Sequence, residues 1–229
     1  MTRHEFLNTF LAMTDNRKAG FALITGALGS ILTMAIHPVA GGMMSQAQVE
    51  RLALMSGIAH SLAMVSSLAL FLGCCGLARR IQASDRIGFA ALVLFGFSTV
   101  AVLIATAVSG FIVPNLIRQM AHDIPNTPFW RIAIVSMFQV NQSFAAIFSV
   151  TALAAIVLWS AGMLRLGGFS RALPIYGCLV PPPLAILIVI GRLPLNVHGM
   201  GVVAFAMAIW FVGAGSMMLR EAPVPTPVT

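Results

Sequence analysis

The sequence predicts an all-helical integral membrane protein, a bundle of six transmembrane helices whose fifth helix is broken or kinked at a triple proline. Of its 229 residues, 59% are hydrophobic and only 8% are charged, whereas soluble proteins carry about 25% charged residues. The mean hydropathy is +0.96. The apolar residues form long uniform runs, whereas a membrane β-barrel needs alternating segments of about 10 residues. These observations together exclude a soluble domain.

Six stretches reach the roughly 20 apolar residues that cross a hydrocarbon core about 30 Å thick. They are, in order, about Ala19–Pro38, Leu52–Ala78, Ile87–Val113, Ile132–Leu164, Ala172–Gly191 and Val197–Leu219. We expect residues 1–18 to form an amphipathic cytoplasmic segment, 19–221 the transmembrane domain and 222–229 a disordered tail. Because the connection from about Pro114 to Arg131 contains three prolines, we expect it to stay irregular or to carry one short helix.

The Lys and Arg residues predict the orientation. Three precede the first span, three lie between spans two and three, two between spans four and five, and one follows span six, against four on the other side. By the positive-inside rule, both termini lie in the cytoplasm of a bacterial inner membrane. Because the Lys and Arg residues are scattered over short loops, we interpret the net charge of +7 as charge that sets the orientation of the spans. Nucleic acid is therefore not an expected partner, and the expected partner is the lipid bilayer.

Neutral polar side chains gather in the half of the predicted bundle that faces outward. The residues concerned are His37, His60, Asn141, Gln142 and His198. One interpretation is that they form interhelical hydrogen bonds that lock the bundle. The functional interpretation is that they line a polar cavity, open to the periplasm, which binds or passes a small ligand. We expect this second role.

Pro181, Pro182 and Pro183 fall near the middle of the fifth span. Each proline removes an N–H donor, so the carbonyls of residues 177–179 lose their helical partners. Transporters use broken helices of this kind to bind ions and substrates. The alternative is a rigid kink whose free carbonyls are satisfied by neighbouring side chains.

The sequence contains no signature of catalysis, such as HExxH, GxSxG or a P-loop. The spans have no Asp or Glu in their interior, which argues against proton-coupled transport. We therefore expect a protein that is not an enzyme and has no cofactor. The first alternative is a redox protein with b-type haem, for which His60 and His198 are the candidate axial ligands.

Two further features leave alternatives open. Met34, Met64 and Met200 lie near histidines, and thioether with imidazole is a ligand set that suits Cu(I), although methionine is also a common packing residue. Small residues at Gly26 and Gly29, and at Gly213 and Gly215, are typical of helix contacts. The second alternative is therefore a structural or assembly partner in a membrane complex. The oligomeric state is not predicted.

Three short segments resemble those of a domain-of-unknown-function family of bacterial six-helix integral membrane proteins. They are Leu77-Ala78-Arg79-Arg80, Ser170-Arg171 leading through Pro174 to Ile175-Tyr176-Gly177, and Ala208-Ile209-Trp210. The resemblance is one of layout over most of the chain. It implies a bacterial inner-membrane protein and no particular activity. The triple proline and the histidines depart from the family pattern.

Overall fold

A computed structural model of the chain describes residues 15–38, 45–82, 86–166 and 170–220. All its regular elements in these ranges are helical, and six apolar segments are long enough to cross a membrane: Asp15–Ile36, Gln46–Ile81, Ile87–His122, Ile124–Leu166, Ala172–Val189 and Val197–Leu219. The predicted all-helical, multi-pass class is therefore confirmed. Residues 1–14 of the predicted amphipathic segment and the predicted disordered tail lie outside the described residues, whereas Asp15–Lys18 form the first turn of the first described helix.

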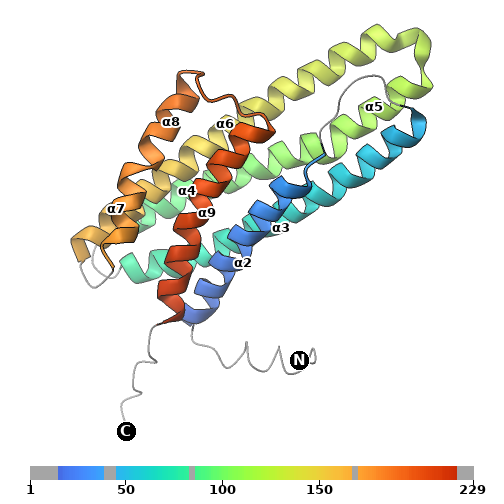
Figure 1. The fold of residues 1–229 in the computed structure, drawn as a ribbon. Coiled ribbons are helices and arrows are strands. Elements are labelled where there is room, and N and C mark those ends of the chain that lie inside the picture. The colour runs from blue at the N-terminus through green and yellow to red at the C-terminus, as the bar shows by residue number, and fades with distance from the viewer. Residues whose placement is uncertain (1–14, 39–44, 83–85, 167–169, 221–229) are drawn as a thin grey trace, which may run out of the picture.

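Figure 1 shows how the helices are arranged. In chain order the elements are α2 (Asp15–Ile36), α3 (Gln46–Gln82), α4 (Ile87–Ala107), the π-helix η1 (Val108–Ile112), α5 (Val113–His122), the 3-10 helix η2 (Ile124–Asn126), α6 (Thr127–Leu166), α7 (Ala172–Leu179), α8 (Pro181–Val189) and α9 (Val197–Leu219). Helix α2 packs between α3 and α9, while α4 packs against α6. We call the end where α2 begins and α9 ends the proximal end, and the opposite end the distal end.

The segment from Pro114 to Arg131 is almost entirely helical. It carries the short helix α5, which was one of the two predicted alternatives, and the other alternative, an irregular connection, is wrong. Two of its three prolines, Pro125 and Pro128, occupy positions where a missing N–H does little harm. Pro114 lies in the first turn of α5, Pro125 in η2, and Pro128 in the first turn of α6. The first turn of a helix has N–H groups with no intrahelical acceptor, so Pro125 and Pro128 remove nothing that is needed. Helix α5, however, continues η1 without a break, so Pro114 leaves one carbonyl without its helical donor.

Glycine allows the closest helix contacts. An added Cβ on Gly20 of α2 would come within 2.7 Å of the Gly215 carbonyl oxygen, and one on Gly215 of α9 within 2.6 Å of the Gly20 carbonyl oxygen. Gly26 and Gly29 face α3 in the same way, against Ser66. Gly213 meets Leu173 of α7. The glycines predicted as helix contacts are therefore used inside this chain.

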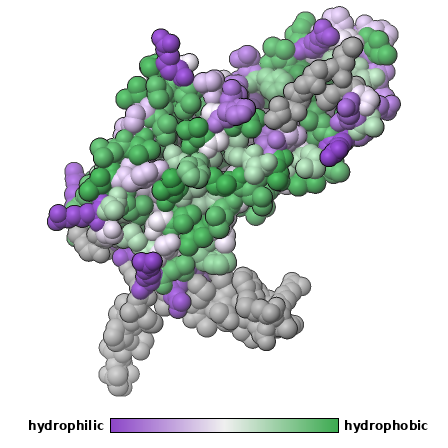
Figure 2. Space-filling model, in the orientation of Figure 1, coloured by the Kyte–Doolittle hydropathy of each residue, from purple (hydrophilic) through white to green (hydrophobic). Residues whose placement is uncertain are grey.

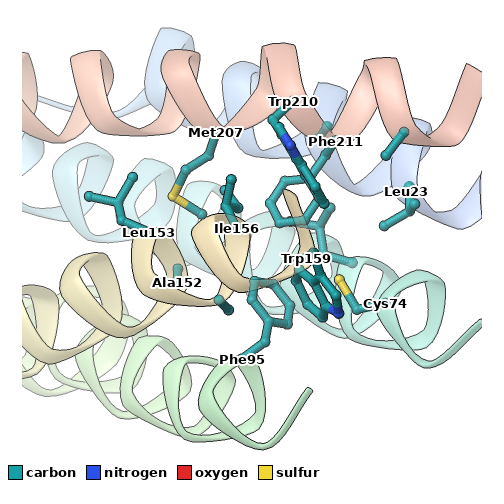
Figure 3. Close-up of a cluster of buried hydrophobic side chains, with 14 of the residues drawn as sticks. Leu23, Cys74, Phe95, Ala152, Leu153, Ile156, Trp159, Met207, Trp210 and Phe211 are labelled. Atoms are coloured by element: carbon teal, nitrogen blue, oxygen red, sulfur yellow. The ribbon is translucent and has the colours of Figure 1, made fainter. Parts of the chain in front are cut away.

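Four aromatic rings meet in the apolar core between α4, α6 and α9 (Figure 3). Trp159 of α6 stacks on Trp210 of α9 with ring centroids 5.9 Å apart, and Phe95 and Phe211 pack edge-on or tilted against them. The indole N–H of Trp210 donates to Ser160 Oγ at 2.9 Å. The indole nitrogen of Trp159 is also fully buried but has no partner among the described residues.

Apolar side chains cover most of the visible outer surface, and hydrophilic ones lie mostly towards its ends (Figure 2). The helices nevertheless differ in length: α2 has 22 residues and α9 has 23, whereas α3 has 37 and α6 has 40. The long helices therefore extend past the others at the distal end (Figure 1). We call this extension, residues 46–59, 113–122 and 127–136, the distal arm.

Polar contacts hold the distal arm together. Both Nε and Nη2 of Arg118 on α5 contact Oε2 of Glu50 on α3, at 3.0 and 2.8 Å. In the turn before α6, Asp123 accepts hydrogen bonds from Nδ2 of Asn126 and from the indole N–H of Trp130, at 3.0 to 3.1 Å. The carboxylate thus ties the end of α5 to the first turn of α6.

These donors, Asn126 first and Trp130 second, hold the pKa of Asp123 below its usual value. Because the unfolded pKa is about 3.9, the carboxylate stabilises the turn above roughly pH 4, and this contribution is lost as the pH falls through the lower folded pKa. With fluorotryptophan incorporated, the ¹⁹F signal of Trp130 should stay constant from pH 8 to 5 and move only in stronger acid. An Asp123→Asn variant should abolish that movement, and a shift near pH 6 in the unsubstituted protein would contradict the assignment.

The fifth span is divided into α7 and α8 at Val180. The backbone of Val180 has φ −87° and ψ −47°, which are right-handed helical values, and its N–H donates to the Tyr176 carbonyl at 2.9 Å. Pro181, Pro182 and Pro183 form the first turn of α8. A sharp break or kink of the span stays a prediction.

Candidate functional site

His37 and His60 come together at the distal end of α2, beside α3. Their ring centroids are 5.0 Å apart and their planes make an angle of 67°. His60 is only 5% exposed, and His37 is half-buried. His37 follows the last residue of α2, so the pair lies at the foot of the distal arm. The structure therefore brings together two of the five predicted ligand-binding residues.

Main-chain carbonyls fix the tautomer of both rings. His60 Nδ1 lies 2.7 Å from the Ser56 carbonyl oxygen, and His37 Nδ1 lies 3.1 Å from that of Pro38. A carbonyl only accepts hydrogen bonds, so each Nδ1 carries the proton and donates it. In the neutral ring each Nε2 then keeps a free lone pair, and this is the form of histidine that binds metals and accepts protons from ligands.

The π-helix η1 packs against His60 at Gly110 and is followed closely by Pro114. In the wider π-turn the Val113 N–H donates to the Val108 carbonyl, and the next donor in that pattern, for the Ser109 carbonyl, is Pro114, which has no N–H. The hydroxyl of Ser56 on α3 supplies the missing donor at 3.0 Å. A side chain thus satisfies the carbonyl that the proline leaves free.

Gly110 of η1 lets His60 approach the backbone. A Cβ at this position would come within 2.5 Å of His60 Cβ and 2.9 Å of Cγ, so only glycine leaves room for the ring. Ser56, Ser109 and Gly110 are not predicted from the sequence. The available signal is a serine one turn before His60, together with a glycine four residues before Pro114.

Ser56 and His60 do not form a catalytic pair. Although Ser56 Oγ lies 3.3 Å from His60 Nδ1, that nitrogen already holds its proton against the Ser56 carbonyl. The serine proton is directed to the Ser109 carbonyl. Nucleophilic catalysis needs an unprotonated base within reach of the hydroxyl, and this geometry does not provide one.

The remaining predicted site residues belong to a different part of the distal end. Gln142 of α6 donates from Nε2 to the Leu195 carbonyl, 3.2 Å away in the connection between α8 and α9. Asn141 is half-buried next to it, and His198 is exposed in the first turn of α9. This hydrogen bond fastens the connection between α8 and α9 to α6.

A cavity of about 40 Å³ lies deeper, among α2, α3, α4, α6 and α9, and none of the five predicted residues lines it. Its lining is mainly apolar. The hydroxyls in its wall belong to Ser30, Ser67 and Thr99, and each bonds to a carbonyl one turn earlier in its own helix. This cavity differs from the polar one that the sequence predicted.

The histidines do not fit bis-histidine haem. Two axial ligands, with Fe–N distances of about 2 Å and about 1.1 Å from Nε2 to each ring centre, place the centroids roughly 6 Å apart on opposite faces of the macrocycle. The His37 and His60 centroids are 5.0 Å apart. His60 pairs with His37 instead of the predicted His198, which is exposed. No step through haem follows from this arrangement.

Comparisons of the chain with protein-family models, with curated proteins and with solved structures find no match. The resemblance to the six-helix family therefore stays a prediction.

Proposed function

We propose that this chain is a non-enzymatic, multi-pass protein of the bacterial inner membrane that binds a small ligand at its periplasmic end, through His37 and His60. The observations that carry the proposal are the tautomer of the two imidazole rings and the short distance between them. Both donate from Nδ1 to carbonyl oxygens, so the two rings, 5.0 Å apart, each present an unprotonated Nε2 when they are neutral. Paired imidazole lone pairs, oriented by carbonyls, are typical of binding sites.

Helix lengths support a position at the membrane boundary. From Lys18 to His37 the rise is about 28 Å, close to the thickness of the hydrocarbon core. From Glu50 to Arg79 along α3 it is about 43 Å, close to a bilayer with its headgroups. The pair would then lie where hydrocarbon meets headgroups, with the distal arm in the headgroup layer. The excess of Lys and Arg near the termini assigns this end to the periplasm.

Native mass spectrometry of the protein purified from its host membrane tests the proposal even while the ligand is unidentified. The unsubstituted protein should carry an added mass, and the His37→Asn/His60→Asn double variant should lack it. Asparagine suits this test because its side-chain amide keeps a donor near the position of Nδ1 and removes Nε2. The fold contacts to Ser56 and Pro38 are thereby preserved.

His198→Asn is the matched control, because His198 lies at the same end of the bundle but is exposed. It should retain the added mass. The same mass on all three proteins would exclude the histidine pair as the site, and no added mass on the unsubstituted protein would overturn the proposal.

A further inference from the structure

We infer that the ligand of the His37–His60 site is a soft monovalent metal ion, Cu(I), held by the two Nε2 atoms and by one methionine sulfur. This inference rests on the proposed function and names its ligand. It starts from the two rings, which the Ser56 and Pro38 carbonyls hold in the tautomer that metals require.

The spacing of the rings suits one shared ion. A metal at about 2.0 Å from each Nε2 lies about 3.1 Å from each ring centre. When both Nε2 atoms are directed at one ion, centroids 5.0 Å apart correspond to an N–metal–N angle of roughly 105°. This angle is strongly bent. Two ligands alone favour a linear arrangement, so the bend leaves a position for a third donor.

Charge favours a monovalent ion. Among the described residues, no group of three or more His, Cys, Asp or Glu is arranged to hold a metal, and the partners of the two histidines are neutral carbonyls and hydroxyls. Glu50 lies ten residues before His60 on α3, about 15 Å along the axis. The cost of burying an ion rises with the square of its charge, so a neutral ligand set suits Cu(I) better than Zn(II) or Cu(II).

Methionine supplies the third donor. Met64 lies four residues after His60 on α3, and Met34 lies three residues before His37 on α2, so each is about one turn deeper than its histidine. Both are half-buried. A thioether is a soft ligand that prefers Cu(I).

The test is an anaerobic titration of the purified protein with Cu(I) held by bicinchoninate, a competing chelator. The unsubstituted protein should withdraw one equivalent. Loss of a first ligand should weaken binding more than the 10–100-fold typical of supporting residues, so His60→Asn or His37→Asn should bind at least about 100-fold more weakly. His198→Asn should stay within about twofold. Whichever of Met34→Leu and Met64→Leu removes the sulfur ligand should also weaken binding by at least about 100-fold, because it too removes a direct ligand, and X-ray absorption should show nitrogen and sulfur scatterers.

Several results would overturn the inference. They are no withdrawal of copper by the unsubstituted protein, equal binding by a His60→Asn variant that elutes as a folded monodisperse species, or tighter binding of Zn(II) than of Cu(I). Unchanged copper binding in both methionine variants would exclude the thioether. If the histidine-dependent mass is present but copper does not bind, the proposed function stands and the metal assignment fails; if both are absent, both fail.

Discussion

Replacing Gly215 with alanine should destabilise the protein by about 3 kcal/mol, because the new methyl group collides with backbone. The added Cβ would lie 2.6 Å from the Gly20 carbonyl oxygen, and a carbonyl cannot rotate away as a side chain can. Overpacking of this kind typically costs 1–3 kcal/mol. For a chain of this size, the melting temperature should fall by roughly 6–12 °C, which differential scanning fluorimetry in detergent measures.

Gly201→Ala is the matched control for this substitution. It lies on the same helix, α9, and no atom lies within 4 Å of the position of its added Cβ. Alanine there should leave the melting temperature unchanged or raise it slightly, since it reduces the entropy of the unfolded chain. Equal melting temperatures for the two variants would show that α2 and α9 do not approach as closely as the structure has it.

The second large effect concerns the two stacked tryptophans, whose N–H groups differ in their partners. Trp210→Phe should cost about 2–3 kcal/mol, because it removes the buried hydrogen bond to Ser160 Oγ and leaves the hydroxyl without its donor. Trp159→Phe should cost clearly less. The N–H that it removes is buried without a partner among the described residues, so losing it recovers part of the desolvation penalty and offsets the lost volume.

A double-mutant cycle separates the hydrogen bond from the volume effect. Ser160→Ala alone should be destabilising, since it leaves the Trp210 N–H unpaired. The Trp210→Phe/Ser160→Ala double variant should be more stable than the sum of the two single effects indicates, because neither partner remains unsatisfied. The measurement is chemical unfolding followed by circular dichroism. Strict additivity, or a larger loss for Trp159→Phe than for Trp210→Phe, would contradict this account.

Prolines show where the sequence prediction fails and why. Pro114, Pro125 and Pro128 indicate an irregular connection when only local composition is considered, yet each lies in a first helical turn or a short 3-10 helix. Proline is excluded from the interior of a helix but favours its first turn. Local composition does not distinguish these positions. Pro114 also leaves the Ser109 carbonyl of η1 without a helical donor, and Ser56 on another helix supplies one.

The candidate site could be predicted only in part. The outward bias of polar residues points to His37 and His60 together with Asn141, Gln142 and His198. In the structure Ser56 and Gly110 lie against His60 of the histidine pair. Gln142 instead fastens the α8–α9 connection to α6. Depth along a span does not tell which neighbouring helix a side chain faces. The sequence indicates the depth of His60 only along its own span. It does not show that His60 lies beside the end of α2, where it contacts His37.

The sequence by itself determined the class of the protein, because apolar runs of about 20 residues without charges are stable only as helices that satisfy their own backbone in lipid. It also carries the charge asymmetry from which the orientation is proposed. The tertiary structure decided which histidines meet and how far the long helices extend past the short ones. Those properties depend on contacts between residues that are distant in the chain. At glycines such as Gly20, Gly110 and Gly215, the neighbouring backbone or ring lies so close that a Cβ atom would not fit. No local sequence pattern encodes such pairings.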